Sequence, residues 1–335
     1  GALLMVAALV ILSDVAYSCQ ISGPTTGGGS RFHVFESSAA LLPAVALVAS
    51  PSLVQMAAYV NSHFAVAVLL LAIAYLLGLS PSAQMGDSPQ TCPSCGSKLY
   101  AVAALCSAVV LLRVEGVVLV SLLLLGAQTR GLCTYRVVWV SIGSTFLGWT
   151  VVVTVGEFVR TGTSTNATRL LLSAAVGLVV AIILSSFAPR VIRRSLPAVA
   201  LVSLWAAAGP ILLSSKSTFL TAVVENITQG AGRWGITVLN LAILAIFAIG
   251  AGRNWTDAPG SAGIRWVLLG FVPLSAIVKA GDALVQPGVG FERLLFSGGR
   301  AGWGDSVNRM WTHILPIAIA LVVVRTTEVL TTGAH

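Results

Sequence analysis

The residues best able to do chemistry in this sequence are ionisable side chains that interrupt long apolar stretches. Arg113 and Glu115 stand two residues apart, between an apolar run that ends at Leu112 and another that begins at Gly116. Ionisable residues inside apolar spans are costly to place, and so they are functional candidates by default. The two side chains can pair with each other at a structural turn, or they can point into a polar cavity.

Two further candidate sites are ionisable residues at or within apolar runs. The segment from Tyr59 to His63, which includes Asn61, joins two apolar runs. His63 can act there as an acid or base or contact a phosphate, and the alternative is an interfacial imidazole that reaches toward water. Asp14 lies inside the first apolar run, where it can pair with a neighbouring helix.

The richest polar stretch of the chain is 281–313. Its ionisable and polar side chains include Asp282, Glu292, Arg293, Arg300, Asp305, Asn308, Arg309 and His313, with Trp303 and Trp311 among them. Arginine can bind phosphate through two parallel hydrogen bonds, and the glycines between 298 and 304 permit close approach of the backbone to a ligand. Aromatic rings can stack on the apolar face of a sugar. The alternative is a solvated loop with an aromatic belt at the membrane surface.

The composition places these residues in a membrane protein. Of the 335 residues, 56% are hydrophobic and 9% are charged, and the mean hydropathy is +0.94. A soluble domain has about 25% charged residues. This excludes a soluble globular enzyme, a disordered chain and a disulfide-stapled secreted domain. The net charge of +8 does not indicate binding to nucleic acid, because the arginines lie singly or in small groups at the ends of apolar runs. Such positions are typical of topology signals and of contacts with lipid headgroups.

Apolar segments recur along the whole chain, at about 1–18, 39–58, 63–80, 99–112, 114–128, 137–155, 170–188, 196–214, 236–252, 264–280 and 312–330. Many approach the roughly 20 residues that cross a bilayer as a helix. We therefore predict an all-α fold, a polytopic transmembrane bundle of about 10–11 membrane segments. It forms one domain over 1–335, with 281–311 as an outer polar loop.

The Lys/Arg bias of short loops predicts the orientation of the bundle. The loop 188–195 holds Arg190, Arg193 and Arg194 and is the strongest cytoplasmic signal. Alternation from it also places 81–98, 130–136 and 253–265 inside. It places outside the segments 61–63, 113–115, 156–169, 215–235 and 281–311. The predicted location is a bacterial inner membrane.

The cysteines give one pattern, Cys92-Pro-Ser-Cys95. No second ligand pair follows at zinc-ribbon spacing, and no thioredoxin-like context surrounds it. We predict a loop turn with two reduced, metal-free thiols; a loop disulfide or half of an intersubunit metal site are the alternatives. No metal or cofactor is expected.

Three motifs resemble the GT-C superfamily of membrane glycosyltransferases. Leu-Leu-Arg113-Val-Glu115-Gly116 resembles the family's L-x-R-x-E/D-G junction between two helices. The segment 42–77, with Ser50-Pro51 and Asn61-Ser62-His63, is similar to the family's third and fourth helices. The segment 304–316, which includes Asp305, Arg309, Met310, His313 and Pro316, resembles the late D-R-M-x-x-H-x-x-P motif that leads into a terminal helix. The motifs occur in the family order.

The resemblance implies an enzyme that takes a sugar from a polyprenyl-phosphate donor and passes it to an acceptor at the outer membrane face. It implies phosphate contacts by Arg113 and Arg309, polar cavity roles for Asp305 and His63, and stacking on sugar or lipid by Trp303. Glu115, Asn61 and His313 complete the expected substrate-binding set. Membrane lipids, the lipid-linked sugar and protein partners in a complex are the expected partners, and nucleic acid is not.

The sequence departs from the family pattern in two places. His63 stands where the family usually has Glu at the outer turn, and the acidic motif of the first extracytoplasmic loop has no counterpart here. The loop count also places Gly1 outside. We therefore expect either an upstream helix and catalytic loop or a degenerate, non-catalytic subunit of a membrane complex. A transporter is a third interpretation, opposed by the lack of an inverted sequence repeat.

Overall fold

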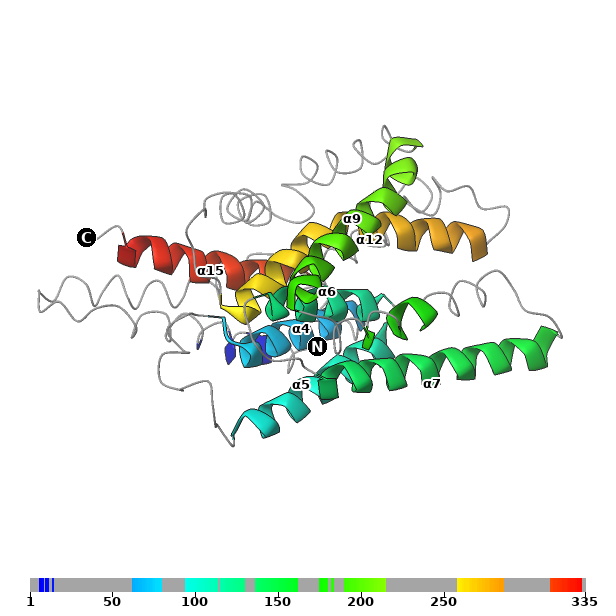
Figure 1. Cartoon of the computed structure of the whole chain (residues 1–335), viewed down its shortest axis with the longest axis horizontal. Helices are drawn as coiled ribbons and strands as arrows, with labels where there is room; N and C mark the ends of the chain where they lie inside the picture. The colour runs from blue at the N-terminus through cyan, green and yellow to red at the C-terminus, as the bar shows by residue number, and fades with distance from the viewer. Residues whose placement is uncertain are drawn as a thin grey trace, which may run out of the picture.

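In the computed structural model, the residues described are 6–8, 10–11, 14, 62–79, 94–113, 115–129, 136–161, 175–179, 182–183, 190–214, 258–285 and 314–332. The main elements are α4 (Ser62–Leu77), α5 (Ser94–Leu112), α6 (Gly116–Gln128), α7 (Arg136–Thr161), α9 (Arg190–Ser214), α12 (Pro259–Val285) and α15 (Leu315–Thr332) (Figure 1). No strand occurs among the described residues. The predicted all-α fold is confirmed for this part of the chain.

Three of these helices are long and apolar enough to cross a membrane. The qualifying stretches are Arg136–Gly156 in α7, Ser195–Leu213 in α9 and Pro259–Ile277 in α12. They overlap the predicted segments 137–155, 196–214 and 264–280. The apolar parts of α4, α5, α6 and α15 are shorter, at 10–17 residues each.

Several segments predicted as loops lie within the ends of helices. The basic segment 188–195 is helical from Arg190 onward, and Arg265, predicted in the loop 253–265, lies inside α12. Likewise α7 continues to Thr161 and α12 to Val285. The physical reason is that a helix satisfies its own backbone hydrogen bonds, so it can continue past the apolar run into the polar interface. Charge therefore marked the ends of the spans but not the ends of the helices.

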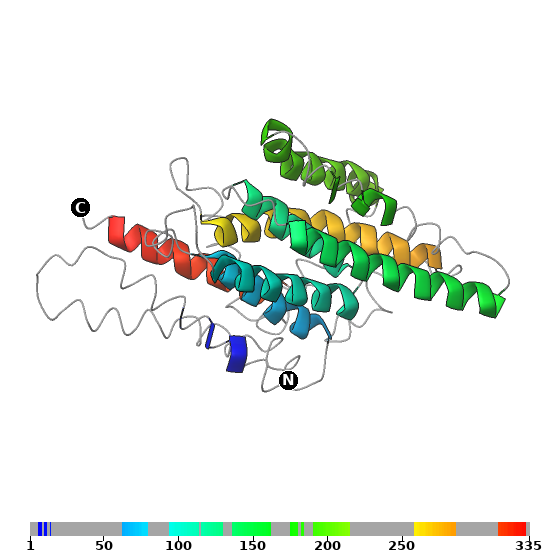
Figure 2. The same cartoon turned by 60° about the horizontal axis from the view of Figure 1, so that its bottom comes forward.

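Consecutive helices α5, α6 and α7 run in alternating directions and define two ends of the bundle. We use "Gly78 end" for the end where α4 finishes and α12 begins, and "Arg113 end" for the end where α5 passes into α6. α5 and α7 run the same way and are joined by a hydrogen bond of 2.7 Å between the hydroxyls of Ser107 and Ser141. Figures 1 and 2 both show α7 continuing well past the other helices at the Arg113 end.

A glycine joint holds the Gly78 end together. Gly78 has φ of 92°, a left-handed conformation that suits glycine after a helix, and its amide donates to the Tyr75 carbonyl at 3.0 Å. The Gly260 amide then donates to the Gly78 carbonyl at 2.7 Å, and the Ser261 hydroxyl donates to the Leu79 carbonyl at 2.5 Å. The first turn of α12 therefore supplies donors to carbonyls that the end of α4 leaves open.

The core lies where α12 packs against α6. A Cβ added at Gly126 would lie 2.9 Å from the Ala262 carbonyl oxygen, and one at Gly263 would lie 2.5 Å from the Leu123 carbonyl oxygen. Leu123 and Ile264 beside this contact are fully buried. Small residues allow such close backbone approach, which is how helices associate where lipid removes the hydrophobic driving force.

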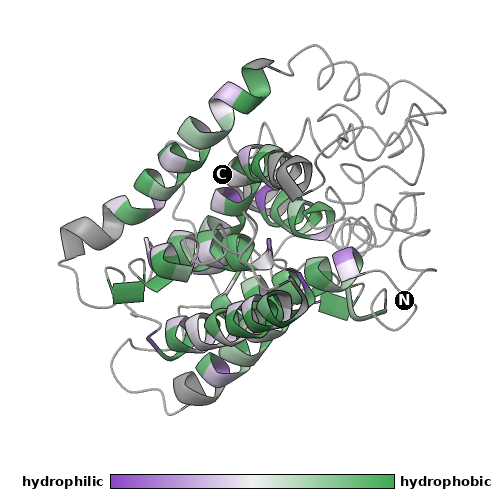
Figure 3. Cartoon of the chain, turned by 90° about the vertical axis from the view of Figure 1, so that its right-hand side faces the viewer, coloured by the Kyte–Doolittle hydropathy of each residue, from purple (hydrophilic) through white to green (hydrophobic). Residues whose placement is uncertain are grey.

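The outer helices α7 and α9 leave large apolar side chains uncovered. Val152 and Val159 of α7 are 70% and 79% exposed, and Val202 of α9 is 67% exposed. Figure 3 shows hydrophobic residues along most of the length of the described helices, with hydrophilic residues few and scattered. Lipid is the surrounding in which such faces are stable, since a soluble monomer rarely leaves so much contiguous apolar surface uncovered.

Candidate functional site

The turn between α5 and α6 brings the predicted Arg–Glu pair together. The Arg113 amide makes the last helical hydrogen bond of α5, to the Val109 carbonyl at 3.1 Å, and the Gly116 amide donates to the Arg113 carbonyl at 3.0 Å. A Cβ at Gly116 would lie 2.7 Å from the Val109 carbonyl oxygen. Glycine is therefore required for α6 to start directly against the last turn of α5, and this tight turn sets the two charged residues side by side.

Arg113 and Glu115 form an ion pair. Both Nε and Nη2 of Arg113 lie 2.7 Å from the same carboxylate oxygen, Oε1 of Glu115. The Glu115 side chain is 3% exposed, whereas that of Arg113 is 32% exposed. Of the two alternatives drawn from the sequence, mutual pairing is the one observed. The buried carboxylate orients the guanidinium, and about a third of the Arg113 side chain is exposed.

The start of α6 adds a second electrostatic contribution. Glu115 occupies the N-cap position of α6, where the partial positive charge of the helix dipole favours an anion. Its carbonyl accepts the amides of Val118 and Leu119 at 3.1 and 3.3 Å. Its side chain makes no capping hydrogen bond, so the carboxylate is directed to Arg113 instead. The Glu115 side chain therefore lies between a cation and the start of a helix.

His63 lies at the same end of the bundle as this pair. It is the second residue of α4, and the last residues of α4 lie at Gly78. At a rise of about 1.5 Å per residue, His63 lies about 20 Å from Gly78. Its exposure is 6%. The expectation of an interfacial imidazole reaching to water is therefore wrong, because α4 is covered along its length by neighbouring helices. The observed position is a buried one on the Arg113 side.

The other predicted binding residues, Asn61, Trp303, Asp305, Arg309 and His313, lie outside the described residues. Their convergence on Arg113 stays a prediction. The segment that carries four of them connects α12, which begins at the Gly78 end and runs away from it, to α15.

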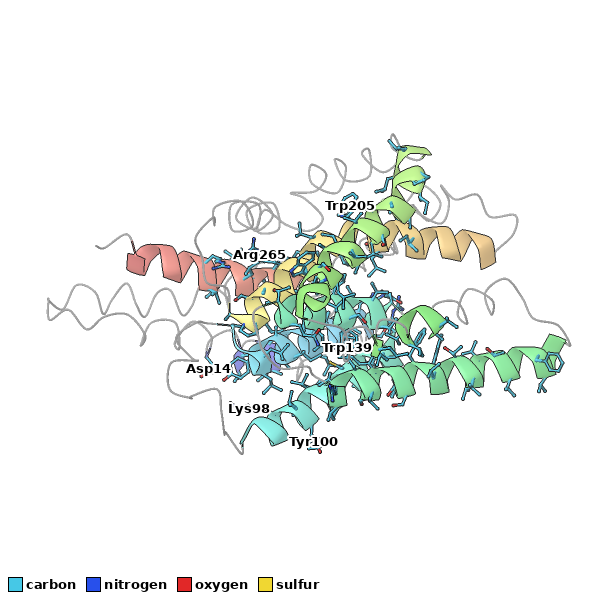
Figure 4. All side chains as sticks on the ribbon, viewed as in Figure 1. Asp14, Lys98, Tyr100, Trp139, Trp205 and Arg265 are labelled. Atoms are coloured by element: carbon cyan, nitrogen blue, oxygen red, sulfur yellow. The ribbon has the colours of Figure 1, made fainter. Side chains whose placement is uncertain are left out.

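The Gly78 end carries a different set of charges. Lys98, Arg136 and Arg265 lie in the first two turns of α5, α7 and α12, three helices that begin at this end. Figure 4 shows Lys98 and Tyr100 near the start of α5, and Arg265 where α12 and α15 lie close together. These three cationic side chains therefore lie at the end that the loop count assigns to the cytoplasm.

Asp14 pairs with a residue that the sequence did not reveal. The Tyr75 hydroxyl, near the end of α4, donates to Oδ2 of Asp14. The prediction that Asp14 pairs with a neighbouring helix is confirmed. Tyr75 was missed because a single tyrosine in an apolar run carries no spacing signal.

The cysteines are placed in part. α5 begins at Ser94, so Cys95 lies in a helix and not in the predicted loop turn, while Cys92 is outside the described residues. Cys106 is a buried free thiol. Within the described ranges, no group of three or more His, Cys, Asp and Glu side chains could hold a metal ion.

Comparison with protein-family models, with curated proteins and with solved structures finds no match for this chain.

Proposed function

We propose that this chain is an integral membrane glycosyltransferase of the GT-C type, which binds a polyprenyl-phosphate sugar at the Arg113 end of the bundle. The observation that carries the proposal is the Arg113–Glu115 pair. A Glu115 side chain that is 3% exposed holds the guanidinium of Arg113, whose side chain is 32% exposed. This is how a protein preorganises a cation for an anionic ligand, because the side chain is oriented before the ligand arrives.

The chemistry follows from the donor. An acceptor hydroxyl attacks the anomeric carbon, the bond from that carbon to the phosphate oxygen breaks, and a general base takes the hydroxyl proton. Negative charge grows on the departing lipid phosphate. Arg113 stabilises that charge, since a guanidinium matches the geometry of phosphate.

The distribution of cations supports the orientation. Lys98, Arg136 and Arg265 lie near the starts of three helices at the Gly78 end, and cytoplasmic ends of membrane helices are enriched in Lys and Arg. We therefore propose that the Gly78 end is cytoplasmic and the Arg113 end faces outward, in a bacterial inner membrane.

The test is binding of polyprenyl phosphate to the purified full chain in nanodiscs. Arg113→Gln keeps hydrogen-bond donors for Glu115 but removes the charge, and we expect it to weaken binding about tenfold or more, as loss of a charge-assisted contact does. Lys98→Gln, at the opposite end, is the matched control and should bind as the unaltered chain does. Equal binding by both variants would remove the basis of the proposal.

A second candidate function is a non-catalytic subunit that keeps the fold. The observation that favours it is the engagement of Glu115 by Arg113, which makes this carboxylate a positioning group and not an open base. A transfer assay separates the two candidates. Sugar release from the lipid donor that depends on Arg113 supports the enzyme, whereas donor binding without release supports the subunit.

A further inference from the structure

The hairpin of α5 and α6 is shorter than the helix beside it. α6 has 13 residues, which is about 20 Å of helix, against about 30 Å for the hydrocarbon core of a bilayer. The apolar stretch Arg136–Gly156 of α7 has 21 residues, about 32 Å, and is long enough to cross. A 13-residue helix that starts at one membrane surface therefore ends well short of the other.

The Ser107–Ser141 hydrogen bond relates the levels of the two helices. From Ser107 to Arg113 is a rise of about 9 Å, and from Ser141 to Gly156 a rise of about 22 Å in the same direction. The apolar stretch of α7 thus passes Arg113 by on the order of 10 Å. This second estimate agrees with the difference of about 10 Å between the length of α6 and the thickness of the hydrocarbon core. We call the part of α7 beyond the level of Arg113 the overhang, and Figure 2 shows α7 continuing past the ends of the other helices.

The exposed side chains on the overhang of α7 indicate whether lipid or water surrounds it. Val151, Val152 and Val155 lie beyond the level of Arg113 and are 59%, 70% and 54% exposed. Leu111, two residues before Arg113, is 62% exposed. If the Arg113–Glu115 turn lay at the membrane surface, the three valines would stand uncovered in water, at roughly 25 cal/mol for each Å² of apolar surface.

We infer that the Arg113–Glu115 pair lies inside the hydrocarbon layer, on the order of 10 Å below the outer surface, and takes its anion sideways from the bilayer. The depth follows from helix lengths, register and the exposed valines, and the choice of the outer surface rests on the proposed orientation. The nature of the anion, the phosphate of a lipid and not free phosphate, rests on the proposed function. The pairing with Glu115 fits this depth, because a cation within the membrane must be held by an opposite charge or by water.

Spin-label accessibility measures the depth. Single cysteines at Leu111, Val152 and Lys98, in the full chain with its five native cysteines replaced, would carry nitroxides in liposomes. We expect the labels at Leu111 and Val152 to collide with oxygen and to be protected from a water-soluble nickel complex, while Lys98 is open to nickel. Nickel access at Val152 equal to that at Lys98 would overturn the inference.

Hydrogen exchange provides a second measurement that needs no substitution. In nanodiscs, the amides from Val151 to Val155 on the unaltered chain should exchange slowly, since they lie in lipid. Rapid exchange there would place the overhang in water and contradict the inference, even if the cysteine-free background failed to fold.

The source of the anion is tested separately. Vesicle-borne polyprenyl phosphate should bind, and inorganic phosphate at millimolar concentration should not displace it. Displacement by inorganic phosphate would show entry from water and overturn the sideways route. A chain that binds neither ligand, with Val152 still protected from nickel, would refute the proposed function and leave the depth intact.

Discussion

Where the first turns of α12 cross α4 and α6, glycines stand against backbone, whereas the glycines described in the outer helices face open space or a single side chain. A Cβ on Gly260 would meet two carbonyl oxygens, at 2.2 and 2.5 Å, and one on Gly263 would meet a third. A Cβ on Gly148 or Gly156 of α7, or on Gly209 of α9, would meet nothing within 4 Å.

Contacts of two kinds hold the inner helices of this bundle together. In lipid, apolar burial discriminates poorly between helix–helix and helix–lipid contact, so close backbone approach and interhelical hydrogen bonds decide which helices associate. The inner helices have both, at Gly260 and Ser261. α9 contacts α12 through the Trp205 indole, which donates to the Leu269 carbonyl at 3.2 Å.

The largest effect is expected at the joint between α4 and α12. Gly260→Val should destabilise the bundle by about 3 kcal/mol or more, because the clashing atoms are backbone and the helices must separate. Thermal unfolding in detergent, followed by circular dichroism, measures it. Gly148→Val is the matched control and should stay within about 0.5 kcal/mol of the unaltered chain. Equal losses would show that the inner and outer glycines do not differ.

The second-largest loss of stability is expected when the ion pair is broken, and the loss should depend on which partner is removed. Arg113→Ala leaves a carboxylate that is 3% exposed without its cation, and we expect a loss of about 2 kcal/mol, below the roughly 3–5 kcal/mol of a fully buried pair. Glu115→Ala leaves an arginine that is one-third exposed and should lose less. The double variant should recover part of the stability. Unfolding by SDS in mixed micelles ranks the three, and the reverse order would contradict the assigned burial.

A smaller effect is expected between α5 and α7. Ser107→Ala removes the hydrogen bond to Ser141 and should cost about 0.6 kcal/mol, the typical value for such bonds in membrane helices. Ser144→Ala, whose hydroxyl bonds within its own helix to the Ser141 carbonyl, is the control and should cost nothing measurable. A larger loss at Ser144 than at Ser107 would show that α7 is not held to α5 by this contact.

The smallest effect has the opposite sign. Gly148→Ala or Gly156→Ala should stabilise α7 slightly, by up to about 1 kcal/mol, because alanine restricts the unfolded backbone and nothing opposes its methyl group. The same unfolding assay detects a rise in the midpoint. A fall would reveal a neighbour packed against that face of α7.

Part of the candidate site could be predicted from the sequence, and part depends on the packing of the helices. The spacing of Arg113, Glu115 and Gly116 was sufficient to predict a charged turn, because all three act within one turn of chain. That Glu115 is the buried member and Arg113 the exposed one depends on the packing of α5 and α6, which no local spacing encodes. The burial of His63 was missed for the same reason.

Composition and the spacing of apolar runs by themselves determined that this chain is helical, suited to lipid, and charged at the ends of its spans. These are local properties, since a helix in lipid must satisfy its own hydrogen bonds within one segment. Which segments touch depends on how the helices pack. Ser261 reaches a carbonyl 182 residues away, and Tyr75 reaches Asp14 across 61 residues. Such contacts depend on where the backbones can approach most closely, and that distance is a property of two helices together, which neither sequence segment contains alone.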